Sequence, residues 1–192
     1  MYTSLNLPEK KDAVFYQTYF QTPGVAEARY EHNIRAAVRS ALYLLSGDVP
    51  ATPETTSGEM AGMIPRAGGL LAEIVDPPAL PSWTSEADAD VYVQQLSRCG
   101  FRGGLNWYRN TARNWELLAP FEGSKITVPA LFIAGDRDFT LSFEGMGRVI
   151  AELPKSVPLL KQTIFLPGCG HWTQQERAKE VNSILLEFLR SF

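Results

Sequence analysis

The stretch Ile126-Thr-Val-Pro-Ala-Leu-Phe-Ile-Ala-Gly-Asp-Arg-Asp-Phe139 contains the strand and the loop that decide the fold. Its apolar run up to Ala134 is typical of a strand that is buried in a parallel sheet. A helix is expected over residues 143–153, and a second strand over residues 163–166. Together with a helix at the end of the chain, these elements predict a β-α-β-α unit of an α/β protein.

The last helix is predicted by two local patterns. Thr173 with Glu176 three residues later indicates a capping box that opens the helix. Apolar residues then recur on one side of it: Val181, Ile184, Leu185 and Phe188. Parallel sheets need several strands that are covered on both faces, and two strands are too few. Residues 123–192 are therefore expected to continue a larger sheet.

A histidine lies on the loop after the second strand, in Gly168-Cys169-Gly170-His171-Trp172. Because open α/β sheets place their sites at the carboxyl ends of the strands, His171 can meet an acid from the first loop. An acid that precedes a histidine in chain order is the second half of an α/β-hydrolase triad. Asp136 and Asp138 could each supply this acid. The alternative is that His171 and both aspartates are ordinary loop and turn residues.

The residues before 123 are expected to form helices and loops. Ser85 with Asp88 predicts a capping box for a helix that ends at Gly100. Helical spacing also covers residues 12–20, 25–45 and 107–118. Residues 47–82 are rich in Pro, Gly, Ser and Thr and are expected to form a long loop. A boundary near residue 122 separates this helical part, residues 1–122, from residues 123–192.

The composition excludes several classes of function. The 192 residues are 45% hydrophobic and 20% charged, with a net charge of −3, which is the balance of a globular protein. The dispersed Lys and Arg residues predict no nucleic-acid partner. The absence of a long apolar stretch or signal peptide predicts no membrane association and a cytoplasmic location. Cys99 and Cys169 have no metal-binding or redox spacing.

Four segments resemble the soluble epoxide hydrolases of the α/β-hydrolase superfamily. They are Tyr19-Phe-Gln-Thr-Pro-Gly-Val-Ala-Glu27, Gly100-Phe-Arg-Gly-Gly-Leu-Asn-Trp-Tyr-Arg-Asn110, Asp136-Arg-Asp-Phe139 and Cys169-Gly-His-Trp-Thr-Gln174. They occur in the order of that family, and the similarity runs from about residue 12 to the end of the chain. The segment around Tyr108 is the most specific of the four.

The resemblance implies an incomplete α/β-hydrolase fold, with a helical lid before the last strands of the parallel sheet. Residues 1–122 would be this lid subdomain with a linker at its start, and residues 123–192 the C-terminal part of the core. Asp138 matches the charge-relay acid and His171 the base. Tyr19 and Tyr108 match the tyrosines that grip the epoxide oxygen. The substrate pocket would include Trp107 and Trp172.

The activity that the resemblance implies is hydrolysis of a small-molecule epoxide to a vicinal diol, without metal or organic cofactor. In that family an aspartate first forms an ester, which a His–Asp pair then hydrolyses. The sequence contains no His-Gly-x-Pro loop and no nucleophile elbow, and Gly-x-Ser-x-Gly is also absent. The chain alone is therefore expected to be inactive and to need the N-terminal half of the core.

Two other functions remain open at this stage. The helical part could bind an apolar ligand or a partner protein without catalysis, because aromatic residues on helices more often serve packing. A haloalkane dehalogenase or an esterase would share the acid–histidine order. Paired tyrosines argue against a dehalogenase, because halide release needs no proton donor.

Overall fold

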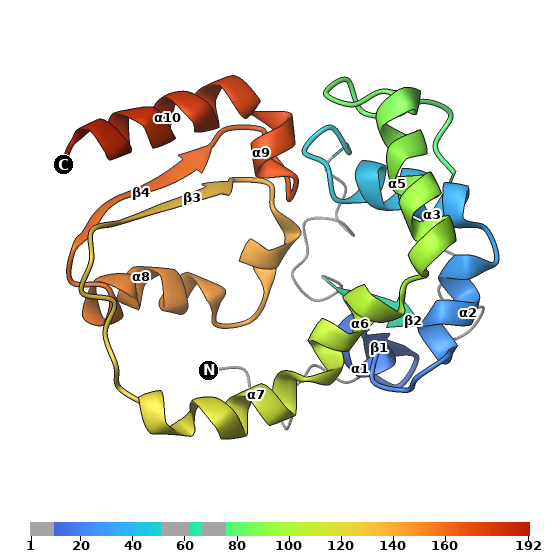
Figure 1. Cartoon of the computed structure of the whole chain (residues 1–192), viewed down its shortest axis with the longest axis horizontal. Helices are drawn as coiled ribbons and strands as arrows, with labels where there is room; N and C mark the ends of the chain where they lie inside the picture. The colour runs from blue at the N-terminus through green and yellow to red at the C-terminus, as the bar shows by residue number, and fades with distance from the viewer. Residues whose placement is uncertain (1–9, 51–61, 67–75) are drawn as a thin grey trace. The chain divides into compact units, whose positions relative to one another are not determined.

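The computed structural model describes residues 10–50, 62–66 and 76–192 (Figure 1). Its residues form two compact units, which we describe separately. The helical unit comprises Met1–Ala41, Gly62–Leu80 and Ser85–Glu122, and the sheet unit comprises Leu42–Ala61, Pro81–Thr84 and Gly123–Phe192.

The sheet unit is built on two parallel strands, β3 (Ala130–Gly135) and β4 (Leu160–Leu166). They are connected through the 3-10 helix η4 (Phe139–Ser142) and the helix α8 (Met146–Ser156). Helix α8 lies on one face of the strand pair, and α10 (Ala178–Arg190) lies on the other (Figure 1). The β-α-β-α order predicted from the sequence is confirmed.

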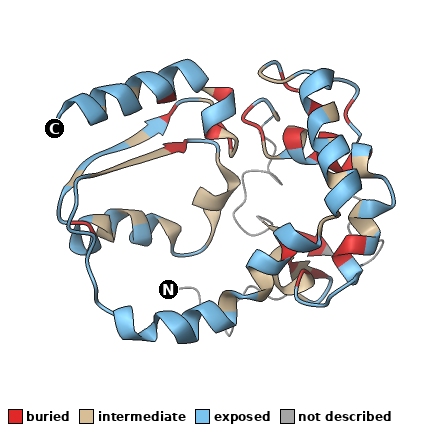
Figure 2. Ribbon diagram, viewed as in Figure 1, coloured by how far each residue is buried: buried red, intermediate tan, exposed pale blue. Residues whose placement is uncertain are grey.

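The core of the sheet unit is small. Leu166, Cys169 and Val181 are buried, and Ile164 and Ile184 pack against them. Most of α10 is exposed, as Figure 2 shows. Leu185, on the apolar side of α10, is 41% exposed. This side of the helix is thus only partly covered, since a sheet of two strands is too narrow to cover it.

The final helix also begins differently from the sequence prediction. A separate turn, α9 (Thr173–Glu176), precedes α10, and its N-cap is Trp172, which makes no side-chain cap. Thr173 is the first residue of α9, and its hydroxyl donates to the carbonyl of Gly170 at 3.2 Å. The capping box predicted for Thr173 and Glu176 is therefore wrong, because both side chains bond to the preceding loop.

Within the ranges that the structure describes, the helical unit contains most of the helices and one short antiparallel pair of strands. Its elements are β1 (Ala13–Phe15), α1 (Tyr16–Tyr19), α2 (Val25–Glu31), α3 (Ile34–Leu44), β2 (Met63–Pro65), α5 (Glu86–Cys99), α6 (Arg102–Arg109), α7 (Thr111–Leu118) and the 3-10 helix η3 (Ala119–Phe121). The last three residues of α3 group with the sheet unit. The capping box at Ser85 is confirmed: its hydroxyl accepts from Asp88 N at 3.2 Å.

Strand β1 replaces the first part of a predicted helix. Phe15 pairs with Met63 and is 1% exposed. Its partner strand lies in the segment expected to be a loop, so local spacing does not reveal the pairing. The predicted helix over residues 25–45 is likewise two helices. Asn33 lies between them, and its side-chain oxygen accepts from Ala36 N at 3.0 Å.

Candidate active site

The loops after β3 and β4 bring an acid and a histidine together. Asp138 caps η4, and its Oδ1 accepts from the backbone N–H and the hydroxyl of Thr140, both at 2.9 Å. His171 follows β4, and its Nδ1 lies 3.1 Å from each carboxylate oxygen of Asp138. The Asp138 side chain is 12% exposed and that of His171 is 37% exposed. The imidazole is therefore held by a largely covered acid and is itself partly exposed.

The other aspartate of the first loop has a different role. Asp136 Oδ1 accepts from the backbone N–H of Gly168 at 2.7 Å, so it links the loop after β3 to the loop after β4. Both aspartates follow the same strand, and their spacing left the choice between them open. In the structure Asp138, and not Asp136, contacts the imidazole.

The charge of Asp138 is favoured by its surroundings. Burial opposes ionisation, but the hydrogen bonds from His171 and from Thr140 outweigh it and lower the pKa of Asp138. An ionised Asp138 accepts a hydrogen bond from Nδ1–H of His171, which fixes the tautomer with a free lone pair on Nε2. The pair can therefore act as a general base through His171 Nε2.

Aromatic rings flank the histidine. The Phe139 ring lies 5.2 Å from the imidazole, and the Trp172 ring lies 5.5 Å from it, in edge-to-face arrangements. Trp172 is thus next to the candidate base, in the same loop. Its predicted role in substrate binding stays a prediction.

Cys169 lies two residues before His171 and is the nearest thiol to it in the chain. It is fully buried, and burial together with the negative charge of Glu176 raises the pKa of its thiol to about 11. A thiol with this pKa stays protonated at neutral pH. Cys169 is therefore a packing residue of the sheet unit and a poor nucleophile.

The two tyrosines that matched the resemblance belong to one aromatic cluster of the helical unit. The cluster is centred on the buried residues Phe20, Ala26 and Leu105. Tyr108 on α6 lies 5.1 Å from the Phe20 ring, and Tyr19 at the end of α1 lies 6.1 Å from it. Burial raises the pKa of Tyr108, which therefore remains a protonated donor at neutral pH.

A buried ion pair fixes the segments that carry these tyrosines. Arg109, next to Tyr108, donates to both oxygens of Glu27, at 2.6 and 2.8 Å. Its Nε also donates to the carbonyl of Phe20, next to Tyr19, at 2.8 Å. Because one guanidinium binds both segments, it fixes the distance between the backbone next to Tyr19 and the backbone next to Tyr108.

This ion pair predicts a stability that depends on pH. The hydrogen bond from Arg109 is the main reason that the pKa of Glu27 falls from 4.5 to about 2. A lowered pKa stabilises the folded chain above pH 4.5, and the contribution is lost as the pH falls toward 2. Glu27→Gln is expected to lower the free energy of unfolding at neutral pH by about 3 kcal/mol, measured by urea denaturation.

The matched control is Glu116→Gln, which removes an exposed ion pair with Arg113 at 3.0 Å. It should change the free energy of unfolding by less than about 1 kcal/mol. The difference between the original chain and Glu27→Gln should shrink as the pH is lowered from 4.5 to about 2. A difference that stays constant over this range would contradict the assignment.

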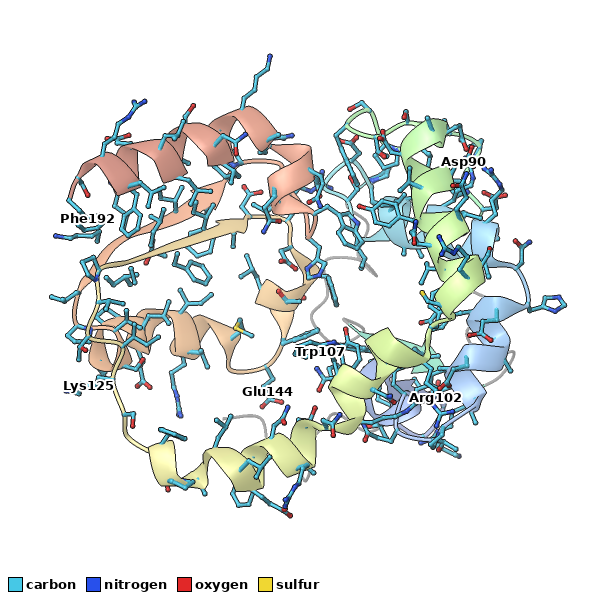
Figure 3. All side chains as sticks on the ribbon, in the orientation of Figure 1. Asp90, Arg102, Trp107, Lys125, Glu144 and Phe192 are labelled. Carbon is cyan, nitrogen blue, oxygen red and sulfur yellow. The ribbon has the colours of Figure 1, made fainter. Side chains whose placement is uncertain are left out.

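Trp107, labelled in Figure 3, precedes Tyr108 on α6. The residue is 79% exposed. A large aromatic ring with this exposure contributes little to the packing of the helical unit. Its predicted role in the substrate pocket stays a prediction. The structure thus brings Asp138 and His171 together in the sheet unit, and packs Tyr19 and Tyr108 around one ring in the helical unit.

Residues 10–50, 62–66 and 76–192 contain no group of three or more His, Cys, Asp or Glu side chains that could hold a metal ion. Within the same ranges, no helix has the length and apolar character needed to span a membrane.

The chain is similar to proteins of known name, although no protein-family model matches it. Epoxide hydrolase A from Mycobacterium tuberculosis is 40% identical over 175 residues, which cover 91% of this chain and 52% of that protein. Bifunctional epoxide hydrolase 2 from Rattus norvegicus is 38% identical over 176 residues, which cover 92% of this chain and 29% of that protein. The chain therefore spans about half the length of the curated relatives it matches, or less.

Solved structures give the same result. The structure of an epoxide hydrolase from an endophytic Streptomyces matches with a TM-score of 0.85 and 40% sequence identity. The match covers 94% of this chain and 53% of that chain. Both the sequence and the fold thus correspond to part of a larger protein.

Proposed function

Because the chain belongs to the epoxide hydrolase family of the α/β-hydrolase fold, we propose that it acts in the hydrolysis of epoxides to vicinal diols. The proposal assigns the general base to His171 and the acid that orients it to Asp138. Tyr19 and Tyr108 are the proton donors. The observation that carries the proposal is the 3.1 Å contact between His171 and Asp138 in a chain 40% identical to an epoxide hydrolase.

The first chemical step opens the epoxide ring. A carboxylate oxygen attacks one epoxide carbon, a carbon–oxygen bond of the ring breaks, and the electron pair stays on the oxygen. This alkoxide is a poor leaving group, so hydrogen bonds from two phenols stabilise it as charge develops. One of Tyr19 and Tyr108 then transfers its proton, which leaves a hydroxy ester bound to the protein.

The second step hydrolyses the ester. His171 Nε2 takes a proton from a water molecule, and the water oxygen attacks the ester carbonyl. Asp138 stabilises the imidazolium that forms. The tetrahedral intermediate collapses, and the protonated His171 gives its proton to the leaving oxygen of the diol. The carboxylic acid that re-forms loses its proton, which returns to the tyrosinate left by the first step. The net reaction consumes one epoxide and one water molecule.

The attacking carboxylate is the one group that we do not assign to a residue of this sequence. The 192 residues contain no nucleophile elbow, and Asp138 is committed to His171. We propose that the ester-forming aspartate belongs to the part of the enzyme that has no counterpart in these residues. The same part would supply further strands next to β3 and β4.

The test is the hydrolysis of styrene oxide, measured as diol by chromatography. The 192-residue chain alone is expected to form no diol above the uncatalysed rate. A fusion of this chain with the part of Mycobacterium tuberculosis epoxide hydrolase A that has no counterpart in it is expected to be active. We call this fusion the completed enzyme.

Each outcome of the test has a clear meaning. Diol formation by the 192 residues alone would contradict the proposed need for an external aspartate. A folded completed enzyme that hydrolyses an alkyl halide or a simple ester, but no epoxide, would contradict the epoxide assignment. A folded fusion that binds apolar ligands without turning over any of these substrates would favour a non-catalytic binding role.

A further inference from the structure

Glu176 is a buried acid that the steps above do not use. Its side chain lies on α9, and the residue is 8% exposed. A buried carboxylate is costly unless hydrogen bonds compensate for its lost hydration. Here the compensation comes from backbone N–H groups of the loop that carries His171.

The carboxylate of Glu176 binds the residues on both sides of the histidine. Oε2 accepts from Gly170 N at 2.8 Å, and Oε1 accepts from Trp172 N at 3.1 Å. The N–H of His171 itself donates to the carbonyl of Leu45 at 2.9 Å. All three consecutive N–H groups of the loop are therefore held by fixed acceptors.

The same carboxylate also binds a segment that follows α3. Oε2 accepts from Gly47 N at 2.9 Å, so one oxygen joins the loop after α3 to the loop after β4. The two backbones are in direct contact, because a Cβ on Gly170 would lie 2.3 Å from Gly47 N. A Cβ on Gly47 would lie 2.3 Å from Gly168 O. Neither loop has space to shift toward the other.

The segment after α3 is in turn bound to the loop that carries Asp138. Arg137, next to Asp138, donates to the carbonyls of Gly47 and Val49. Arg137, the neighbour of the acid, thus holds the carbonyls of Gly47 and Val49, and Glu176 holds the N–H of Gly47. This arrangement fixes the relative position of the two loops, and so of the acid and the imidazole.

We propose that Glu176 is a positioning residue for His171, which keeps Nδ1 directed at Asp138 by holding the N–H groups of Gly170 and Trp172. Its effect on turnover depends on the proposed function, whereas its effect on the His171–Asp138 contact does not. Glutamine has only one oxygen, so in Glu176→Gln the amide NH₂ faces at least one N–H group. The loop then loses an acceptor, and the imidazole is free to turn away from Asp138.

The first test needs no substrate. Two-bond ¹H–¹⁵N correlation spectra of the 192-residue chain, recorded where the imidazole is neutral, report which ring nitrogen of His171 carries the proton. The original chain should show the Nδ1–H form, because Asp138 accepts a hydrogen bond from that N–H group. Glu176→Gln should show a mixture of both forms, whereas the exposed control Glu180→Gln should resemble the original chain.

The second test uses the completed enzyme. Glu176→Gln should lower kcat about 10- to 100-fold, because a displacement of about 1 Å at the base has this effect. The rate of the first ester-forming burst should remain unchanged, since His171 acts only in the second step. The control Glu180→Gln should change neither rate.

The outcomes separate this proposal from the proposed function. An inactive but folded completed enzyme would contradict the proposed function and leave the tautomer test intact. If folded Glu176→Gln shows only the Nδ1–H form of His171, the proposed positioning role of Glu176 is wrong. Glu176→Asp keeps the charge but is too short to reach both loops, and it should also show the mixed tautomers. Loss of folding in both variants would overturn the proposal as well, because Glu176 would then support the unit as a whole.

Discussion

His171→Gln in the completed enzyme is expected to stop turnover after one round of ester formation. The ring opening uses the aspartate and the tyrosines, so it does not need the imidazole. The hydrolysis of the ester does need it, and kcat should fall about 10³-fold or more, as in other enzymes that lose a catalytic base. Mass spectrometry of the intact protein after mixing with styrene oxide should show the mass of one added substrate molecule.

The two aspartates of the first loop provide a matched control. Asp138→Asn should lower kcat by about 10⁴-fold, because an amide at this position favours the wrong tautomer of His171. Asp136 bonds to the backbone of Gly168 and makes no contact with the imidazole, so Asp136→Asn should retain turnover within about 10-fold. Equal losses in the two aspartate variants would contradict the assignment of Asp138 as the acid that orients His171. A lack of trapped ester in His171→Gln would contradict the assignment of the histidine as the base of the second step.

The sheet unit could be predicted from sequence because its signals are local. The apolar run that forms β3 and the spacing of the residues in α10 are both visible within a short window. The parallel pairing follows from the helix that connects the two strands. How much of Leu185 is exposed depends on how many strands lie beside α10, which no local pattern contains.

Elements with distant partners could not be predicted in this way. Phe15 belongs to a strand only because Met63 lies beside it, and the short run around Phe15 has helical neighbours. Glu176 shows the same limit at the candidate site. Its spacing from Thr173 indicates a cap, but its oxygen binds Gly47, far away in the sequence.

Sequence could not decide whether Asp136 or Asp138 contacts His171, for a different reason. Both residues follow the same strand, and either side chain could reach the histidine from its place in the loop. The structure uses one to cap η4 and hold the imidazole, and the other to accept from Gly168 N. Which of the two aspartates contacts the imidazole depends on the geometry of the loop, and the residue types do not specify that geometry.

The other large effect is expected from substitution of Tyr19 and Tyr108, which should slow the ring-opening step. Tyr19→Phe and Tyr108→Phe should each slow ester formation about 100-fold in the completed enzyme, since each removes one donor to the alkoxide. The double variant should lose about 10⁴-fold in kcat/KM. In contrast to His171→Gln, it should accumulate no ester, because the ring does not open. Rapid-quench measurement of the burst separates the two cases.

Tyr30 is the matched control for this prediction. Its ring belongs to the same cluster and stacks on Phe101 at 5.0 Å. Its pKa is raised by burial, so it too is a protonated phenol at neutral pH. Tyr30→Phe removes a hydroxyl from the same packing environment and should leave the burst within about 3-fold of the original rate. If it slows the burst as much as Tyr108→Phe does, the tyrosines support the packing around Phe20 and do not donate to the epoxide oxygen.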